Sequence, residues 1–435
     1  MTNIKLIICI LAFFLMPDIH SQTLNIPSCD ASKDGCFAYE YFGDTNRNGK
    51  AHGKGRMVYE NGVETEGRWV NGDIVEGKTT DLDGSSYEGE YKDYRPHGYG
   101  EKYWPTGSSY KGRWKNGERH GKGVHIFAQS LQDDGIWIRK YDGQFVEGKA
   151  TGTASITYSD GSSYEGKVLN WGKNGYGEYI YADRKSTHKG NWKENKLHGS
   201  GVQKLANGRV VEGYWKENLL DGYVEIDYED GATFKGNFKK NNMEGYGVGL
   251  NRNGYGYTGM FKDGLFDGFG EMVLETHTLN GNWEKGKIKD GARTEKDGSL
   301  YQGTFNDIGQ SHGTGALNYI KGPKSNHFSY RGEFVNGAIS GTGIKTWTGD
   351  DGTKYRYTGE FKKNKEEGKG ELNILNDDGS FKFRLYMGDY INGLFHGKGT
   401  MVRLNGSEPN GFMRGEFKEG VPHGEVYDEF TVNEI

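Results

Sequence analysis

A short pattern, aromatic-x-Gly-x-aromatic, recurs along almost the whole of this 435-residue chain. About 15 copies are present, and their central glycines mostly lie 22–24 residues apart. The copies that best define the repeat core are Tyr87-x-Gly89-x-Tyr91, Tyr110-x-Gly112-x-Trp114 and Tyr357-x-Gly359-x-Phe361. Self-similarity at a short fixed period is typical of repeat proteins, in which each unit packs on its chain neighbours.

A second pattern, [His/Glu/Asp]-Gly-x-Gly, follows each copy by about seven residues, as in His97-Gly98-x-Gly100. Asn-Gly or Asp-Gly dipeptides such as Asn116-Gly117 separate the patterns. These dipeptides readily adopt positive φ and join the strands of β-hairpins. Each repeat is therefore predicted to be strand, turn, strand, turn.

Alternation along a strand places Tyr87, Gly89 and Tyr91 on one face and Glu88 and Glu90 on the other. Aromatic rings are expected to lie over the bare glycines and so offset the weakness of glycine in strands. Burial on one face only explains a hydrophobic content of 33% beside 72 glycines. We predict an all-β chain, an elongated, single, twisted antiparallel sheet of tandem β-hairpins.

The combined pattern Tyr-x-Gly-x-[Phe/Trp]-x-x-Gly-x-x-[His/Glu]-Gly-x-Gly resembles the MORN repeat, the membrane occupation and recognition nexus motif. The resemblance covers residues 42–427. It implies a row of β-hairpins in one long antiparallel sheet. It also implies a scaffold that binds proteins, with phospholipid association in some members.

The N-terminus is typical of a secretory signal peptide. Lys5 precedes an 11-residue apolar run, Leu6–Met16, and the small Ser21 stands before Gln22. The run is short for a membrane span. An uncleaved anchor or a buried strand are the alternatives. The sequence therefore predicts an exported protein, periplasmic, at the cell surface or secreted.

The expected organisation is a signal peptide at 1–21, an N-terminal cap at 22–41, the repeat array at 42–427 and a tail at 428–435. Cys29 and Cys36 are the two cysteines beyond the signal peptide. In an exported protein they are expected to form a local disulfide, with two free thiols as the alternative.

A net charge of −5 lacks the basic character that nucleic-acid binding needs. The same charge predicts no strong attraction to anionic lipid. Neither consideration speaks against a protein partner.

The histidines that precede a Gly-x-Gly pair are His52, His97, His120, His198, His312, His396 and His423. Equivalent positions in adjacent repeats should lie about 10 Å apart, whereas metal–nitrogen bonds are about 2.1 Å long. We therefore expect these side chains to be polar partners of nearby turns, and we predict no metal site.

Other motifs with catalytic or ligand-binding potential lack the neighbouring sequence that their chemistry requires. Gly254-x-Gly256-x-x-Gly259 matches a dinucleotide fingerprint, but no helix pattern follows it. Three Asp-Asp-Gly stretches, beginning at Asp133, Asp350 and Asp377, lack full calcium-loop spacing and favour turn chemistry. The sequence predicts no catalytic residue, no cofactor and no enzymatic activity.

The pair Gly-x-Gly is interrupted beyond Gly77, Gly152, Gly222 and Gly291, where another residue takes the place of the second glycine. Those residues are Thr79, Ala154, Val224 and Arg293. The spacing suggests a three-repeat superperiod that sets the bend or twist, or else drift in a tolerant array.

The function favoured by the sequence is a non-enzymatic interaction scaffold at the cell envelope or outside the cell. A carbohydrate- or envelope-polymer-binding module and a lipid- or membrane-associating repeat protein are the alternatives. Three insertions, roughly 128–136, 322–328 and 348–356, are the expected places for specific recognition.

Overall fold

The computed structural model describes residues 39–128, 135–320, 327–405 and 408–429. These ranges contain 32 β-strands and no helix, which confirms the predicted all-β class. Since they hold no helix, they hold none with the length and apolar character needed to cross a membrane. The predicted signal peptide and the two cysteines Cys29 and Cys36 lie outside the described residues.

The chain divides into two compact units, residues 1–206 and 207–435. The strands of the first unit are β1 (Tyr39–Thr45), β2 (Ala51–Tyr59), β3 (Glu64–Val70), β4 (Asp73–Thr80), β5 (Ser86–Lys92), β6 (Arg95–Tyr103), β7 (Ser109–Lys115), β8 (Glu118–Ile126), β9 (Ile138–Val146), β10 (Lys149–Tyr158), β11 (Ser163–Leu169), β12 (Gly172–Ile180), β13 (Thr187–Lys193) and β14 (Lys196–Lys204).

The strands of the second unit are β15 (Val210–Lys216), β16 (Leu219–Asp227), β17 (Thr233–Lys239), β18 (Asn242–Leu250), β19 (Gly256–Lys262), β20 (Leu265–Val273), β21 (His277–Glu284), β22 (Lys287–Glu295), β23 (Leu300–Phe305), β24 (Ser311–Tyr319), β25 (Phe328–Val335), β26 (Ala338–Thr348), β27 (Lys354–Lys362), β28 (Lys365–Leu375), β29 (Phe381–Ile391), β30 (Leu394–Asn405), β31 (Glu408–Lys418) and β32 (Val421–Glu429).

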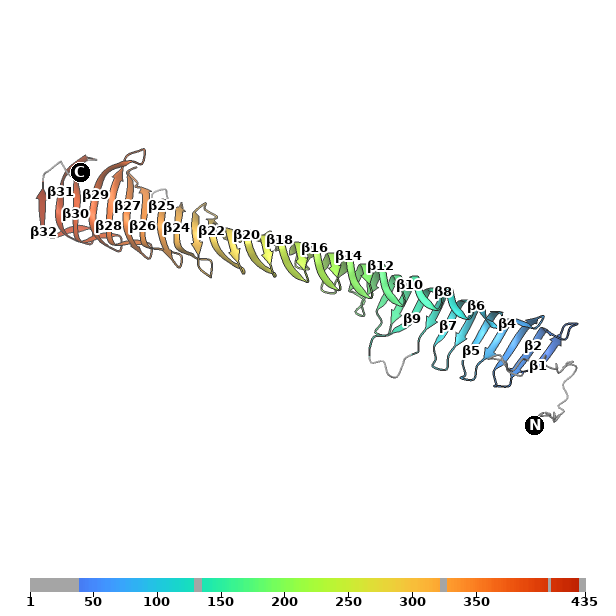
Figure 1. Cartoon of the computed structure of the whole chain (residues 1–435). Coiled ribbons are helices and arrows are strands. Elements are labelled where there is room, and N and C mark those ends of the chain that lie inside the picture. The colour runs from blue at the N-terminus through green and yellow to red at the C-terminus, as the bar shows by residue number, and fades with distance from the viewer. Residues whose placement is uncertain (1–38, 129–134, 321–326, 406–407, 430–435) are drawn as a thin grey trace, which may run out of the picture. The chain divides into compact units, whose positions relative to one another are not determined.

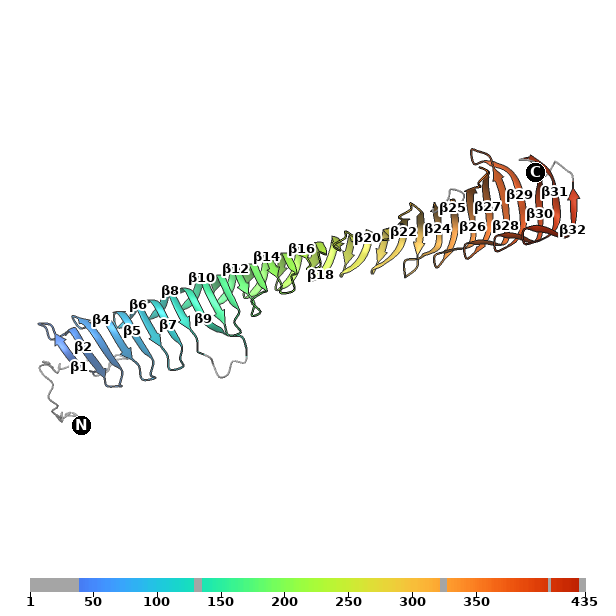
Figure 2. The same ribbon diagram turned by 180° about the vertical axis from the view of Figure 1, so that it is seen from behind.

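Within each unit the strands pair antiparallel in chain order, and the central glycines line up across them. Gly89 in β5 faces Gly100 in β6, which in turn faces Gly112 in β7. Opposite views show each unit as a single layer of strands (Figures 1 and 2). The predicted tandem-hairpin sheet is therefore present in both units.

The predicted Asn-Gly turns close the hairpins. Asn116 and Gly117 both have positive φ, 52° and 88°, as a two-residue turn between twisted strands requires. The amide of Gly117 donates to the carbonyl of Pro96 at 2.9 Å, so the turn also bonds to the preceding hairpin.

One face of the sheet, here called the packed face, carries the buried tyrosines. Tyr87 is 3% exposed, and its hydroxyl donates to the Glu90 carbonyl at 2.8 Å. A Cβ added at Gly100 would lie 2.3 Å from the Tyr87 Oη. The second glycine of each Gly-x-Gly pair therefore makes room for the ring, and the tyrosine covers its own sheet without a second layer.

The first glycine of the pair has a different role. Pairing moves from Gly89 opposite Gly100 to Tyr91 opposite Pro96, so three residues of β6 oppose Glu90 alone. Gly98 lies in this β-bulge with φ of +64°, a conformation that favours glycine. The expectation that aromatic rings lie over the bare glycines is therefore wrong for the first glycine of the pair.

Tryptophans add bonds between neighbouring hairpins. The Trp114 Nε1 donates to the Gly100 carbonyl at 3.1 Å, across the boundary between two repeats. Trp69 and Trp283 make the same bond, to Gly55 and Gly270. The second aromatic position thus stabilises the contact between neighbours on which a repeat array depends.

The four interruptions of Gly-x-Gly are of two kinds. Gly77 and Gly291 pair with central glycines, so the second glycine of the pair is present there and the first is missing. Ala154 and Val224 instead pair with central glycines and do replace the second glycine. Because the changes differ, a uniform three-repeat superperiod does not describe them.

Candidate interaction surface

The repeat-core residues predicted from the sequence lie on the packed face. Their rings meet edge to face with centroids 5.0 Å apart in the pairs Tyr87–Tyr91, Tyr110–Trp114 and Tyr357–Phe361. A Cβ at Gly89, Gly112 or Gly359 would come within 2.7 Å of a tyrosine hydroxyl. This face is filled by its own side chains, so its repeat core is structural.

In several repeats the polar residue before the Gly-x-Gly pair accepts a hydrogen bond from the turn of the next repeat. The His97 Nδ1 accepts from the Asn116 amide at 3.5 Å. Glu244 and Glu367 accept in the same way from Asp263 and Asn392, at 3.2 and 3.1 Å. Asp267 accepts from the Lys285 amide at 3.3 Å, so His, Glu and Asp each provide an acceptor, which explains why they interchange. Among the described residues, no group of three or more His, Cys, Asp or Glu could hold a metal ion.

Charged side chains enter the packed face of the first unit at Arg119 and Lys173. The Arg119 Nη1 lies 2.6 Å from the His125 Nδ1, and its guanidinium lies 5.4 and 5.3 Å from the Phe145 and Trp171 ring centroids. The Lys173 ammonium lies 4.9–6.0 Å from the ring centroids of Tyr158, Tyr164, Tyr179 and Trp192. Burial lowers the pKa of Lys173 to about 8. Both cations are held by aromatic faces in place of the apolar residue usual at that position.

Two buried histidines also replace apolar or tyrosine residues. His125 stacks on Phe127 with ring centroids 4.0 Å apart. Burial, and then the Arg119 charge, lower the pKa of His125 to about 4. His188 occupies the first aromatic position of its repeat at 0% exposure, and burial lowers its pKa to about 4.

These histidines make the stability of the first unit sensitive to acid. Both pKa values fall from 6.5 to about 4 on folding, so the unfolded chain binds more protons between those values. Their contribution is fully present above pH 6.5 and is lost as the pH falls towards 4. We expect each histidine to lower the free energy of unfolding by about 1–2 kcal/mol between pH 7.5 and 5. Urea unfolding at both values measures this difference.

The substitutions His125→Gln and His188→Tyr should each reduce the loss of stability between pH 7.5 and 5. Gln keeps an acceptor for Arg119, and Tyr is the residue that other repeats carry at the position of His188. His423→Gln is the control, because His423 is exposed. Equal pH dependence in all four proteins would contradict the assignment.

The opposite face, here called the exposed face, is mostly charged, but not in the first three repeats of the second unit. There β15, β16, β18, β19 and β20 present a set of large apolar side chains, here called the aromatic row. Its members, with their exposed fractions, are Tyr214 (54%), Tyr223 (48%), Tyr246 (58%), Met260 (40%) and Phe269 (61%). Tyr246 and Met260 lie directly opposite each other in the register.

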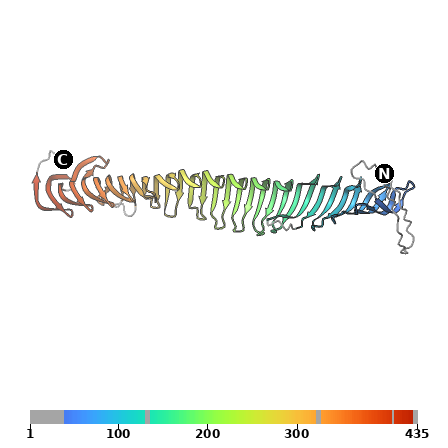
Figure 3. The same cartoon turned by 60° about the horizontal axis from the view of Figure 1, so that its bottom comes forward.

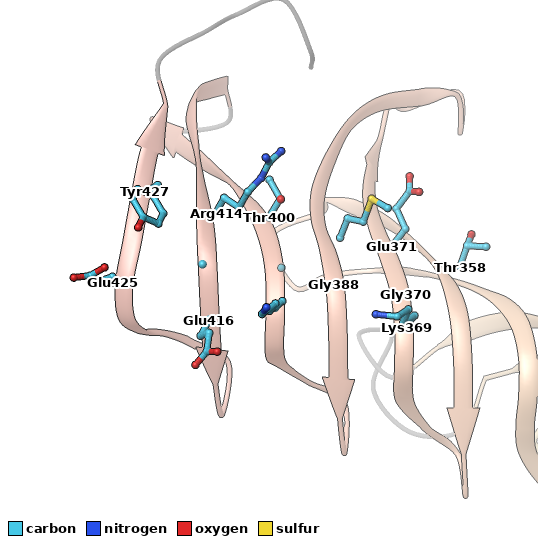
Figure 4. Close-up of a pocket in the computed structure, with 14 residues that line it drawn as sticks. Thr358, Lys369, Gly370, Glu371, Gly388, Thr400, Arg414, Glu416, Glu425 and Tyr427 are labelled. Carbon is cyan, nitrogen blue, oxygen red and sulfur yellow. The ribbon is translucent and has the colours of Figure 1, made fainter.

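A hollow of about 880 Å³ lies on the exposed face near the C-terminus, over β27–β32. Strands β28–β31 have 11 or 12 residues and are visibly curved (Figure 3). In the hollow Thr400 and Arg414 lie side by side, opposite each other in the register (Figure 4). Gly370 and Gly388, which face each other on β28 and β29, also line it. Its charged side chains are of both signs, namely Lys369, Glu371, Lys398, Arg414, Glu416 and Glu425.

A second hollow, of about 830 Å³, adjoins the predicted insertion at 348–356. That segment is less a loop than an extension of β26 and β27, joined by a turn in which Asp351 accepts from the Thr353 amide at 2.9 Å. Trp347 and Tyr355 stack beside it with centroids 5.3 Å apart. Turn formation thus accounts for Asp351. The insertions at 128–136 and 322–328 lie mostly outside the described residues.

Twelve segments of the chain match the family described as MORN repeat, and together they cover more than half of its residues. The matched segments are residues 47–64, 87–109, 110–130, 141–163, 164–185, 188–208, 234–248, 257–278, 330–351, 357–372, 386–408 and 414–425. The chain belongs to the MORN repeat family. Aromatic-x-Gly-x-aromatic is therefore the core of a MORN hairpin, as the sequence predicted.

The relatives of this MORN protein share only part of their length with it. Alsin from mouse and alsin from human are each 38% identical over 87 residues, which is 19% of this chain and 5% of alsin. A solved structure, the SAS-4 TCP domain of Drosophila melanogaster in complex with a proline-rich motif of Ana2, is 13% identical. The match covers 48% of this chain and 96% of that one with a TM-score of 0.20, which is too low to indicate a shared fold.

The 32 described strands make 16 MORN hairpins, one more than the sequence pattern indicated. The hairpin missed is β1–β2, where the Tyr41 hydroxyl lies over Gly55 and Thr45 stands where the second aromatic residue is usual. Four hairpins fall outside the matched segments and contain Gly67, Gly213, Gly281 and Gly303. Their strands pair as the others do. The Gly303 hairpin keeps the pattern, as Tyr301-x-Gly303-x-Phe305, whereas those of Gly67, Gly213 and Gly281 depart from it, so the hairpin also forms where the consensus is weaker.

Proposed function

We propose that this MORN protein is a non-enzymatic scaffold that binds another protein through its exposed face. The observation that carries the proposal is the aromatic row, which leaves five large apolar side chains 40–61% exposed on adjacent repeats. Contiguous exposed apolar patches mark interaction sites in soluble proteins. Tyrosine, phenylalanine and methionine are also enriched in the centres of protein interfaces.

The non-enzymatic part of the proposal is supported by the way charged groups are used on the packed face. Arg119 lies against His125, and Lys345 pairs with Glu366 at 2.9 Å, both among aromatic rings. These buried charged groups therefore have packing partners that explain their presence.

A photo-cross-linking side chain at Phe269 of the full-length protein tests the scaffold function in the native cell. We expect a discrete adduct with one protein partner. The same side chain at Ile308, which is 78% exposed but lies in a turn far along the second unit, is the control. Equal labelling from both positions, or none from Phe269, would overturn the proposal.

We also propose that the protein acts outside the cytoplasm. The support is the sequence alone, a charged Lys5, the apolar run Leu6–Met16 and the small residue Ser21. The mature protein is expected to begin at Gln22, which N-terminal sequencing or intact-mass measurement of the native protein checks.

The variant Leu11→Arg should hold the protein inside the cell, because it puts a charge in the apolar core of the signal peptide. Leu24→Arg lies beyond the expected cleavage site and is the matched control. Recovery of the intact N-terminus from wild-type protein in the cytoplasm would remove the export proposal.

Glycan binding is the second candidate function, favoured by the exposed rings of Tyr176 and Tyr246 in the two units. Lipid association receives less support, because the hollow near the C-terminus carries side chains of both signs. Binding to vesicles with anionic lipid at low salt, compared with binding to neutral vesicles, tests the lipid association.

A further inference from the structure

The rings of the aromatic row repeat at a constant interval. Tyr223, Tyr246 and Phe269 are each 23 residues apart and occupy the middle of three consecutive [Asp/Glu]-Gly-x-[Gly/Val] segments. They lie in β16, β18 and β20, every second strand of the second unit. Strands in a sheet are about 4.8 Å apart, so successive rings lie about 9.6 Å apart along the sheet.

The surroundings of the row favour an uncharged ligand. The Glu225 carboxylate accepts from Lys235 at 2.8 Å and from the Tyr223 hydroxyl at 3.2 Å, so these charges compensate each other. Asn237 lies opposite Tyr223 in the register, and Asn282 lies opposite Phe269. Asn237 thus lies between the strands of Tyr223 and Tyr246, Met260 lies between those of Tyr246 and Phe269, and Asn282 lies beyond Phe269, so two side-chain amides accompany the apolar row.

The setting of the row differs from that of Tyr99, an exposed ring of the first unit. In the first unit Tyr99 occupies the equivalent position, but its backbone amide bonds to Glu90 and it lies opposite Arg113. Two charged side chains thus flank that single ring. A ligand that needs several rings in line finds them at the row and not at Tyr99.

A polyproline II helix matches the interval of the row. It rises about 3.1 Å per residue with three residues per turn, so every third residue returns to the same side after about 9.3 Å. Its carbonyls have no internal hydrogen-bond partners, so they can accept from side-chain amides such as those of Asn237 and Asn282. Aromatic surfaces bind such segments with little loss of conformational entropy.

We propose that the aromatic row binds an extended proline-rich segment of another protein, with one proline on each of the rings of Tyr223, Tyr246 and Phe269. The proposal rests on the scaffold function above and names the chemistry of its partner. A second copy of this chain is a poor source, because its seven prolines are scattered and none forms Pro-x-x-Pro.

Fluorescence anisotropy with a labelled all-proline nonapeptide and the full-length protein tests the proposal. We expect saturable binding, and no binding of a Gly-Ser peptide of equal length. The triple variant Tyr223→Ser/Tyr246→Ser/Phe269→Ser should bind at least about tenfold more weakly, since truncating central aromatic anchors has effects of this size. Tyr99→Ser, on the same face of another repeat, should bind within about twofold of wild type, and circular dichroism checks that all variants fold.

The outcomes separate this proposal from the scaffold function. If the proline peptide fails to bind while Phe269 still cross-links to a protein, the proline-rich partner is overturned and the scaffold stands. If cellohexaose displaces or replaces the peptide, the row binds glycans instead. If the triple variant still binds the peptide as tightly as wild type does, the peptide site lies outside the aromatic row and the proposal is overturned.

Discussion

Replacing Gly100 with valine is expected to lower the free energy of unfolding of the first unit by about 3 kcal/mol or more. A Cβ at this position would lie 2.3 Å from the Oη and 2.5 Å from the Cζ of Tyr87. The ring cannot retreat, because it is 3% exposed and meets Trp114 at a centroid distance of 5.2 Å. Valine must therefore expel the ring or part the strands.

Urea or thermal unfolding of the full-length protein, followed by circular dichroism, measures the effect of Gly100→Val. Gly135→Val is the matched control, because a Cβ there has no atom within 4 Å and the backbone is not in the left-handed region. The control should unfold like wild type. Equal stability of Gly100→Val and Gly135→Val would show that the ring does not depend on the bare glycine.

Another hairpin of this chain suggests a second substitution that should restore part of the stability lost in Gly100→Val. In the hairpin β15–β16 the tyrosine position holds Val211 and the second glycine position holds Val224, with both side chains buried. The double variant Tyr87→Val/Gly100→Val copies that solution. It should be more stable than the sum of the two single changes predicts, by about 1–2 kcal/mol, because the two positions share one space.

The packed face was predictable because two strong signals coincide there. A period of two placed Tyr87 and Gly89 on one face, and the 23-residue period repeated that arrangement many times. The bulge at Gly98 was not predictable in the same way. Its glycine also fits a plain strand pattern, and only the register shows three residues opposite Glu90.

The aromatic row escaped the sequence reasoning because a repeat pattern ignores its variable positions. Tyr223, Tyr246 and Phe269 occupy the unspecified residue of the second pattern, where other repeats carry Lys122 or Lys398. Identity at such a position says nothing about the fold. It becomes informative only when the register shows that these residues lie on one face of neighbouring strands.

Removing the carboxylate of Glu366 is expected to destabilise the second unit by about 2–3 kcal/mol. The Lys345 Nζ lies 2.9 Å from the Glu366 Oε1, and the two side chains are 22% and 15% exposed. The ammonium also lies 5.2 Å from the ring centroids of Phe328 and Trp347. Breaking a buried pair leaves one desolvated charge, and the partial exposure here reduces the usual cost.

The preceding repeat carries an apolar version of the same pair, in which Leu317 and Ile339 take the positions of Lys345 and Glu366. The single change Glu366→Ile should therefore be destabilising. The double change Lys345→Leu/Glu366→Ile should return the free energy of unfolding to within about 1 kcal/mol of wild type or above it, since apolar replacement of a buried pair is often neutral or stabilising. Urea unfolding of wild type, Lys345→Leu, Glu366→Ile and the double variant measures both effects. If the double variant is no more stable than Glu366→Ile, the loss of stability comes from the shape of the glutamate side chain and not from the lysine charge left without its partner.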